Sequence, residues 1–301
     1  MRVAVLGLGR MGAPIAERLE RAGHELAVWN RSPAATSAFV SRGATLLASP
    51  RAAWDHAELV ITMLADDDAV KAVTLGEAGL LAADRVSTGT LVEMSTISAT
   101  ASAEIAAAAA AKQLGYLRAP VSGNPSVVTA GKLGIIVSGP TAEFERLAPT
   151  LREIGPNLFH VGDGEQARIV KLALNLMIGG TTQLLAEALV LAESHGLQRG
   201  RMLEVIAGSA IGSPYVNYKQ GTLLSGDYSS TFTARLLHKD LGLALAAGHD
   251  CSVPLPVTAV VQQLVEGCIA QGMGDLDLAV LIPRLEREAG RENRTGPSIV
   301  T

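Results

Sequence analysis

The chain has 301 residues, which is long enough for two domains that each bury a core. Hydrophobic residues make up 48% of it and charged residues 18%, as in a globular and somewhat apolar protein. The net charge is −4, the pI is near 5.9 and aromatic residues are only 3%. Nucleic acid and anionic membranes are therefore not expected as partners, since proteins that bind them are usually basic.

The sequence carries no clear signal for export or membrane insertion. The apolar N-terminal run is short, is broken by Gly7 and Gly9, and has no small-residue cleavage site after it. The longest apolar stretch, residues 172–192, contains three polar side chains, which is typical of a buried core helix rather than a membrane span. Two cysteines are too few for a disulfide framework, so we predict a cytoplasmic protein with reduced thiols.

Strand and helix patterns alternate in residues 1–162. Short apolar runs predict strands, and helical patterns such as the alanine-rich segment 102–115 lie between them. Ser32 with Pro33 and the acidic run 66–68 predict two helix starts. Alternation of this kind is typical of a parallel, doubly wound α/β sheet. The predicted strands are 3–7, 24–30, 59–64, 90–95, 135–139 and 158–162.

The pattern changes near residue 162. A helical pattern covers residues 165–194 without proline, and only Gly179–Gly180 weakens it. Further helices are predicted at 200–208, 235–248, 256–272 and 275–290. We therefore predict an all-α C-terminal domain over residues 163–290, followed by a polar, flexible tail at 291–301.

A glycine-rich loop follows the first strand and opens the first helix. Its G-x-G-x-x-G pattern is weak evidence alone, but this position between strand and helix makes it specific for a Rossmann-type dinucleotide-binding domain. The first glycine permits a tight turn, the second lets the backbone approach a pyrophosphate, and the third lets helix and strand pack closely. The predicted cofactor-binding residues of this loop are Gly7, Leu8, Gly9, Arg10, Met11 and Gly12.

The second strand ends in Asn30, Arg31 and Ser32, where an NAD-selective site usually places a carboxylate. Without that carboxylate, nothing repels a 2′-phosphate, and Arg31 can pair with one. The same residues could also be a solvated loop and a helix cap. We predict a preference for NADP(H) over NAD(H).

Lys171 and Asn175 lie four apart in an otherwise apolar helical run, so they share one helix face. The helix alone favours a lysine whose head reaches water. Beside a cofactor, however, a positioned ammonium group can stabilise charge on a carbonyl oxygen and deliver a proton to it.

Five stretches in order resemble the β-hydroxyacid dehydrogenase family, which includes 3-hydroxyisobutyrate dehydrogenases and glyoxylate/succinic semialdehyde reductases. The resemblance covers nearly the whole chain. The stretches are GLGRMGAPIAERL (7–19), EMSTIS (93–98), APVSGNPSVVTAGKL (119–133), ARIVKLALN (167–175) and FTARLLHKDLGLAL (232–245).

The resemblance implies a role for each matching residue. Lys171 is implied as the general acid/base, with Asn175 as its companion. Ser122 and Gly123 are implied to hold a substrate carboxylate, and Thr96 to lie near nicotinamide and substrate. Beside these, Phe232 and Asp240 are expected at the substrate and Lys239 at the cofactor. Apart from the resemblance, the backbone of Met63, Leu64 and Ala65, at the end of a predicted strand, is expected to pass the cofactor. The family commonly forms dimers or tetramers through its helical domain.

The substrate loop departs from the family pattern. Asn124 stands where many relatives have glycine, Pro125 stiffens the loop, and Val128 replaces an alanine. We therefore include Asn124 among the substrate-binding residues and expect a substrate other than the simplest hydroxyacids. The six histidines show no ligand spacing, so no metal site is predicted.

Three alternative functions remain open. An imine reductase shares this architecture, but such relatives usually lack a lysine at the position of Lys171. A non-catalytic, cofactor-binding regulatory protein should also lack it. A decarboxylating enzyme of the 6-phosphogluconate type would need a longer helical domain and more basic residues to grip a phosphate. The sequence therefore favours an NADP(H)-dependent enzyme that interconverts a β-hydroxyacid and its semialdehyde or keto form.

Overall fold

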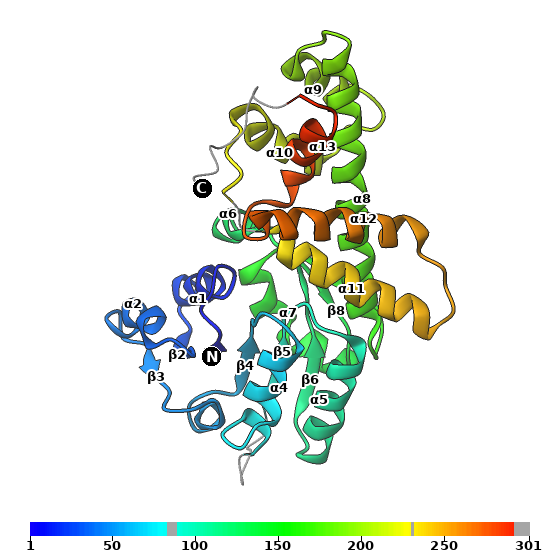
Figure 1. Cartoon of the computed structure of the whole chain (residues 1–301). Coiled ribbons are helices and arrows are strands. Elements are labelled where there is room, and N and C mark those ends of the chain that lie inside the picture. The colour runs from blue at the N-terminus through cyan, green and yellow to red at the C-terminus, as the bar shows by residue number, and fades with distance from the viewer. Residues whose placement is uncertain (83–88, 230–231, 292–301) are drawn as a thin grey trace. The chain divides into compact units, whose positions relative to one another are not determined.

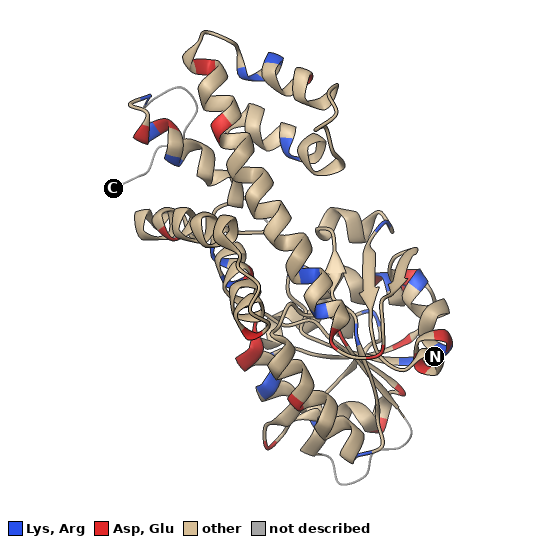
Figure 2. Cartoon of the chain, turned by 90° about the vertical axis from the view of Figure 1, so that its right-hand side faces the viewer, with Lys and Arg blue, Asp and Glu red and all other residues tan. Residues whose placement is uncertain are grey.

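The computed structural model describes residues 1–82, 89–229 and 232–291 (Figure 1). Its internal contacts divide the chain into a first unit, Met1–Leu172, and a helical unit that begins at Ala173. Most of the tail predicted at 291–301 lies outside the described residues. Charged residues of both signs are scattered along the described ribbon, with no large region of one sign (Figure 2).

A six-stranded parallel sheet forms the centre of the first unit, as the alternating pattern predicts. The strand order is β3-β2-β1-β4-β5-β6. The chain first adds β2 and β3 on one side of β1 and then adds β4, β5 and β6 on its other side, so the strand order reverses between β1 and β4. In doubly wound sheets, ligands bind at the carboxyl ends of strands beside such a reversal. The strands are β1 (Arg2–Leu6), β2 (Glu25–Trp29), β3 (Thr45–Leu46), β4 (Leu59–Thr62), β5 (Thr90–Glu93) and β6 (Gly115–Arg118).

Both faces of this sheet are buried. Along β1, Val3 and Val5 belong to one hydrophobic cluster, whereas Ala4 and Leu6 belong to another. Strands covered on both faces are apolar at successive positions, which explains why they stand out in the sequence. The helices of this unit are α1 (Gly12–Arg21), η1 (Pro33–Thr36), α2 (Ser37–Val40), η2 (Pro50–Ala52), α3 (Ala53–His56), α4 (Asp67–Leu75), η3 (Leu80–Ala82), α5 (Ala99–Ala111), α6 (Pro125–Thr129) and α7 (Thr141–Ile154).

The two predicted helix starts differ in their capping. Asp66 caps α4, because its side chain accepts a hydrogen bond of 2.9 Å from the N–H of Ala69. Ser32 precedes Pro33 at the start of a 3₁₀ helix, but its side chain makes no capping hydrogen bond. The start at Ser32 therefore depends on the fixed φ of Pro33 rather than on a serine cap.

The last two predicted strands belong to a separate, mixed sheet of β7 (Val121–Ser122), β8 (Gly134–Val137) and β9 (Asn157–His160). In it, β7 and β8 are antiparallel, and β8 and β9 are parallel. The segment that joins β7 to β8 contains only the short helix α6.

Helix α8 (Gln166–Ser194) runs through both Gly179 and Gly180 without a break, as predicted. A Cβ at Gly179 would lie 3.4–3.5 Å from Leu237, Leu241 and Val261, so the helices pack closely there. By length and composition, α8 could cross a membrane, and 39% of its most apolar window is buried in this structure. Its face with Arg168 and Asn175 is buried in protein, as expected for a core helix.

The helical unit confirms the predicted all-α organisation over the residues that the structure describes. Its core includes Leu189, Leu203, Leu237 and Val265. The elements after α8 are α9 (Arg199–Ala207), α10 (Pro214–Ser225), α11 (Ala234–Asp250), α12 (Pro256–Cys268), the π-helical turn η4 (Ile269–Met273), η5 (Leu278–Val280) and α13 (Leu281–Glu288).

Candidate active site

The glycine loop lies at the carboxyl end of β1 and is closely packed on one side. Gly7 has a φ of +96°, and a Cβ there would lie 2.3 Å from the carbonyl oxygen of Met63. A Cβ at Gly12 would lie 1.8 Å from the carbonyl oxygen of Gly7. Around Gly9, by contrast, a Cβ would meet nothing within 4 Å. The loop is therefore shaped for glycine at its ends and open at its centre, which fits the approach of a pyrophosphate at the start of α1.

Asn30 connects this loop to the end of β2. Its Oδ1 accepts a hydrogen bond of 2.9 Å from the N–H of Leu8, and its Nδ2 donates one of 3.0 Å to the carbonyl oxygen of Ser32. Arg31 and Ser32 are exposed. The Asn30 amide therefore holds the loop backbone in place, while the Arg31 guanidinium beside it faces solvent.

The segments after β4 and β5 are fixed to each other. The N–H of Leu64 donates a hydrogen bond of 2.8 Å to Ser95 Oγ. The N–H and hydroxyl of Ser98 donate bonds of 2.9 Å and 2.5 Å to the Asp67 carboxylate. Thr96 lies half-buried between these two attachments. Because β1, β4 and β5 are parallel neighbours, the glycine loop, residues 63–65 and Thr96 lie at the same edge of the sheet.

The predicted substrate loop begins at the end of β7. Ser122 is half-buried, and Gly123 has a φ of +146°, a backbone region that favours glycine. Asn124 Oδ1 accepts hydrogen bonds from the N–H of Val127 at 3.0 Å and from Ser126 Oγ at 2.7 Å. Asn124 is thus the N-cap of α6, with Pro125 as the first helical residue. An asparagine cap followed by proline is visible in the sequence, but we interpreted these residues only as a change in the substrate loop.

Lys171 is half-buried in the second turn of α8. Arg168, one turn earlier, is 1% exposed and pairs with the fully buried Glu93 carboxylate. Arg168 Nη1 also donates a hydrogen bond of 2.8 Å to the carbonyl oxygen of Ser95. These contacts hold the first turn of α8, one turn before Lys171, at the end of β5. Arg168 was not among the predicted site residues, although its i, i+3, i+7 spacing with Lys171 and Asn175 places all three on one helix face.

Three predicted residues meet inside the helical unit. Asn175, which is 1% exposed, donates a hydrogen bond of 2.6 Å from Nδ2 to Asp240 Oδ2. Lys239 Nζ lies 3.0 Å from Asp240 Oδ1. Asp240 is 3% exposed, so this is not a solvated surface pair. Phe232 is partly buried against the same helical core.

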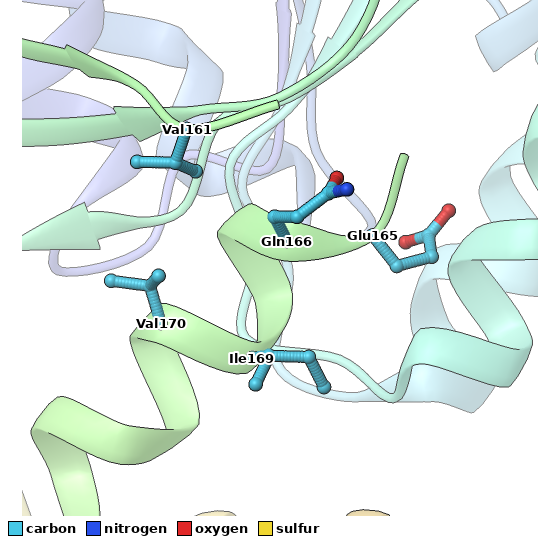
Figure 3. A pocket seen from close by; sticks show the side chains of 5 residues that line it. All are labelled: Val161, Glu165, Gln166, Ile169 and Val170. Atoms are coloured by element: carbon cyan, nitrogen blue, oxygen red, sulfur yellow. The ribbon is translucent and has the colours of Figure 1, made fainter. Parts of the chain in front are cut away.

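An open hollow of about 490 Å³ lies along the first two turns of α8 (Figure 3). Val161 projects toward it from the end of β9, opposite Val170, and Ile169 adds a third apolar side chain (Figure 3). Glu165 completes the lining together with Gln166, and its carboxylate pairs with Arg118. The hollow is lined mainly by apolar groups, and Lys171 is not among its lining residues.

Comparisons with known proteins agree with this arrangement. Residues 2–162 match the family model of the NAD binding domain of 6-phosphogluconate dehydrogenase. Residues 165–285 match the NAD-binding domain model of NADP-dependent 3-hydroxyisobutyrate dehydrogenase. Both family models describe NAD-binding domains.

Named relatives cover almost the full length of the chain. The 2-(hydroxymethyl)glutarate dehydrogenase of Eubacterium barkeri is 36% identical over 96% of each protein. The 3-hydroxyisobutyrate dehydrogenase of Pseudomonas aeruginosa is 37% identical over 87% of this chain and 90% of that enzyme. A structure of the Mycobacterium tuberculosis 3-hydroxyisobutyrate dehydrogenase with L-serine superposes with a TM-score of 0.85 at 29% identity, covering 95% of this chain and 99% of that one.

Fold, glycine loop and relatives together define an oxidoreductase of the NAD(P)-dependent dehydrogenase and reductase class that acts on CH–OH groups. The chain belongs to the β-hydroxyacid dehydrogenase family.

Proposed function

We propose that the protein is an NADP(H)-dependent enzyme that interconverts a β-hydroxyacid and its semialdehyde or keto form, with Lys171 as general acid/base. One observation carries this proposal. Arg168 fixes the start of α8 at the end of β5, so Lys171 lies one helical turn from the sheet edge that carries the glycine loop and Thr96. This edge is where a dinucleotide binds in a doubly wound sheet.

In this proposal, NADPH supplies the hydride for reduction when it is bound. The ammonium group of Lys171 stabilises the charge that develops on the carbonyl oxygen and delivers a proton to it. In the oxidative direction, the free amine of Lys171 accepts the proton of the hydroxyl group. Asn175 Oδ1 is buried and accepts no hydrogen bond from the described residues, so it is available to the substrate hydroxyl or to Lys171.

The preference for NADP(H) rests on the end of β2. The Asn30 side chain is neutral and occupied by the Leu8 N–H and the Ser32 carbonyl, so no carboxylate opposes a 2′-phosphate there. The exposed Arg31 offers a bidentate partner for that phosphate. Arg10 in the glycine loop and Lys239 in the helical unit add positive charge to the proposed cofactor-binding set.

We further propose that Ser122 and Gly123 hold a carboxylate of the substrate. The names of the relatives support this class, since 3-hydroxyisobutyrate and 2-(hydroxymethyl)glutarate both carry carboxylates next to a primary alcohol. In this proposal, residues 1–162 bind the cofactor, and residues 163–290 bind the substrate and form the dimer. The enzyme is proposed to be cytoplasmic.

Assembly into a homodimer or homotetramer through the helical unit is part of the proposal. Met177, Leu184 and Leu191 of α8 are each at least 63% exposed and recur every seven residues, so they form one apolar stripe. Light scattering at micromolar concentration measures the mass directly, and a monomer would contradict this part.

The decisive experiment is a substrate panel with NADPH and NADP, in which small aldehydes, keto acids, 3-hydroxyacids and cyclic imines are compared. The proposal expects turnover of carbonyl compounds and hydroxyacids, and loss of it in Lys171→Ala. Turnover of imines alone would favour the imine reductase. NADPH binding without turnover on the whole panel would favour the regulatory protein.

A further inference from the structure

A buried polar network surrounds the start of α8. The Arg168 guanidinium pairs through Nη2 with the Glu93 carboxylate, and the two side chains are 1% and 0% exposed. Its Nη1 donates a hydrogen bond of 2.8 Å to the carbonyl oxygen of Ser95, and its Nε donates one of 3.2 Å to Ser102 Oγ. A single side chain thus ties the first turn of α8 to the end of β5 and to α5.

The network continues to the neighbouring strands. Glu93 Oε1 accepts a bond of 2.7 Å from the N–H of Ser95, whose Oγ accepts one of 2.8 Å from Leu64. Arg168 Nη2 donates a bond of 3.3 Å to the hydroxyl of Tyr116 in β6. Burial raises the pKa of Tyr116, so this phenol stays neutral. The network therefore joins α8 to the ends of β4 and β5, the two segments predicted to pass the cofactor.

Stability alone is a poor explanation for this pair. Burying two charges carries a large desolvation cost, and well-packed apolar residues can often replace such a pair without loss of stability. An arginine with several directed bonds, however, fixes the rotation and height of the helix that carries it, because the guanidinium is a rigid planar fork. Apolar packing at this position would not define that orientation as sharply.

We propose that Arg168 is a positioning residue that acts through Lys171. The two lie three apart on one face of α8, so the bonds that hold Arg168 at the end of β5 also set the place of the Lys171 ammonium relative to Thr96. Because Arg168 is buried, it does not itself reach the substrate. This inference rests on the proposed function, in which Lys171 is the acid/base.

The first test is Arg168→Lys, which keeps the positive charge but loses the fork. Since a misplacement of about 1 Å can cost roughly 100-fold in rate, we expect kcat to fall by at least about tenfold. A fluorescence titration should show that NADPH still binds to the variant stoichiometrically. The primary isotope effect with 4-deuterated NADPH should increase, because the chemical step becomes slower. A kcat within about twofold of wild type would overturn the inference.

A double-mutant cycle with Lys171→Ala separates positioning from other effects. If Arg168 acts through Lys171, Arg168→Lys causes no further loss of kcat once Lys171 is gone. Losses that multiply in the double variant would overturn the inference. Near-normal activity of Lys171→Ala would instead refute the proposed function. A normal Lys171→Ala loss with wild-type kcat in Arg168→Lys would refute the positioning role alone.

A second variant keeps the test valid if Arg168→Lys does not fold. The pair Arg168→Met with Glu93→Gln removes both charges together, so we expect a folded protein with reduced kcat. The matched control is Lys219→Met with Asp277→Asn, which removes the buried pair of the helical unit, 4% and 5% exposed with Nζ–Oδ1 at 2.7 Å. The control should keep wild-type kcat. An equal loss of kcat in both double variants, or wild-type kcat in the first, would overturn the inference.

Discussion

Helix α8 carries two polar clusters that differ in how their buried groups are paired. Around Arg168 in the first unit, five acceptor groups from β5 and the residue just after it, from β6 and from α5 surround the guanidinium. Around Asn175 in the helical unit, Nδ2 bonds Asp240, while Oδ1 is buried without a partner among the described residues. Buried polar groups are normally paired, so an open acceptor is a candidate for ligand binding. The first cluster pairs its charges within the first unit, whereas the second leaves a buried acceptor open among the described residues.

Lys171 stands between Arg168 and Asn175 in the sequence of α8, and its removal should have the largest effect. We expect Lys171→Ala to lower kcat by at least about 100-fold, because a positioned acid/base contributes about that much or more. NADPH binding should be retained, since no part of the glycine loop changes. Lys171→Arg is the matched control: it keeps a positive charge but cannot act as a base, so it should also be slow in oxidation. Activity near wild type in Lys171→Ala would refute the mechanism.

Asn175→Asp tests the cluster of Asn175 and Asp240. We expect kcat to fall by roughly tenfold or more, because the substitution removes a hydrogen-bond donor and adds a negative charge. The new carboxylate would face Asp240, now 2.6 Å from Asn175 Nδ2, and Lys239 would offset only part of the repulsion. Repulsion raises the pKa of one carboxyl above its unfolded value of about 4. The stability of the variant relative to wild type is therefore highest below the unfolded pKa of about 4. This relative stability is lost as the pH rises through the raised pKa of the folded state. Melting temperatures of the variant and of wild type at pH 5 and pH 8 measure this loss. The same difference in melting temperature between the two proteins at both pH values would contradict the prediction.

Substitutions at the end of β2 should have a smaller effect, which concerns the preference for NADPH over NADH. Asn30→Asp can still accept the Leu8 N–H, but its second oxygen would face the Ser32 carbonyl and carry charge toward a 2′-phosphate. We expect the ratio of kcat/KM for NADPH over NADH to fall by about tenfold, which corresponds to about 1.4 kcal/mol. Arg31→Ala should shift the ratio in the same direction. A wild-type ratio in both variants would contradict the proposed preference.

Much of the fold was predictable because its signals are local. All six predicted strands form. Five of them are largely buried and so are apolar at successive positions, whereas β9 is partly exposed; α8 follows its unbroken helical pattern through Gly179–Gly180. Strands β3, β6 and β7 were missed. Two of them, β3 and β7, have two residues each, too few for a periodic pattern, and β6 (Gly115–Arg118) begins where the predicted helical segment 102–115 ends. The separate sheet of β7, β8 and β9 depends on pairing partners and connection length, which no local pattern encodes.

The site was predictable to the extent that motifs carried it. The glycine loop and the residues of the resemblance could be named from the sequence. The spacing of Arg168 with Lys171 and Asn175 was visible, but its burial was not, because an arginine in a helix is usually exposed and its partner Glu93 lies 75 residues earlier. The contact between Asn175 and Asp240, 65 residues apart, is equally non-local.

The substrate loop gives the smallest predicted effect and tests whether Asn124 serves the fold or the substrate. Because its Oδ1 caps α6, Asn124→Ala should cost about 0.5–2 kcal/mol of loop or protein stability. Asn124→Asp is the matched control, since a carboxylate also caps well. If Asn124 only shapes the loop, Asp restores the KM for 3-hydroxyacids that Ala raises. If its amide also selects the substrate, Asp fails to restore that KM even though stability returns. Equal activity on 3-hydroxyisobutyrate before and after Asn124→Gly would count against any role of this residue in substrate choice.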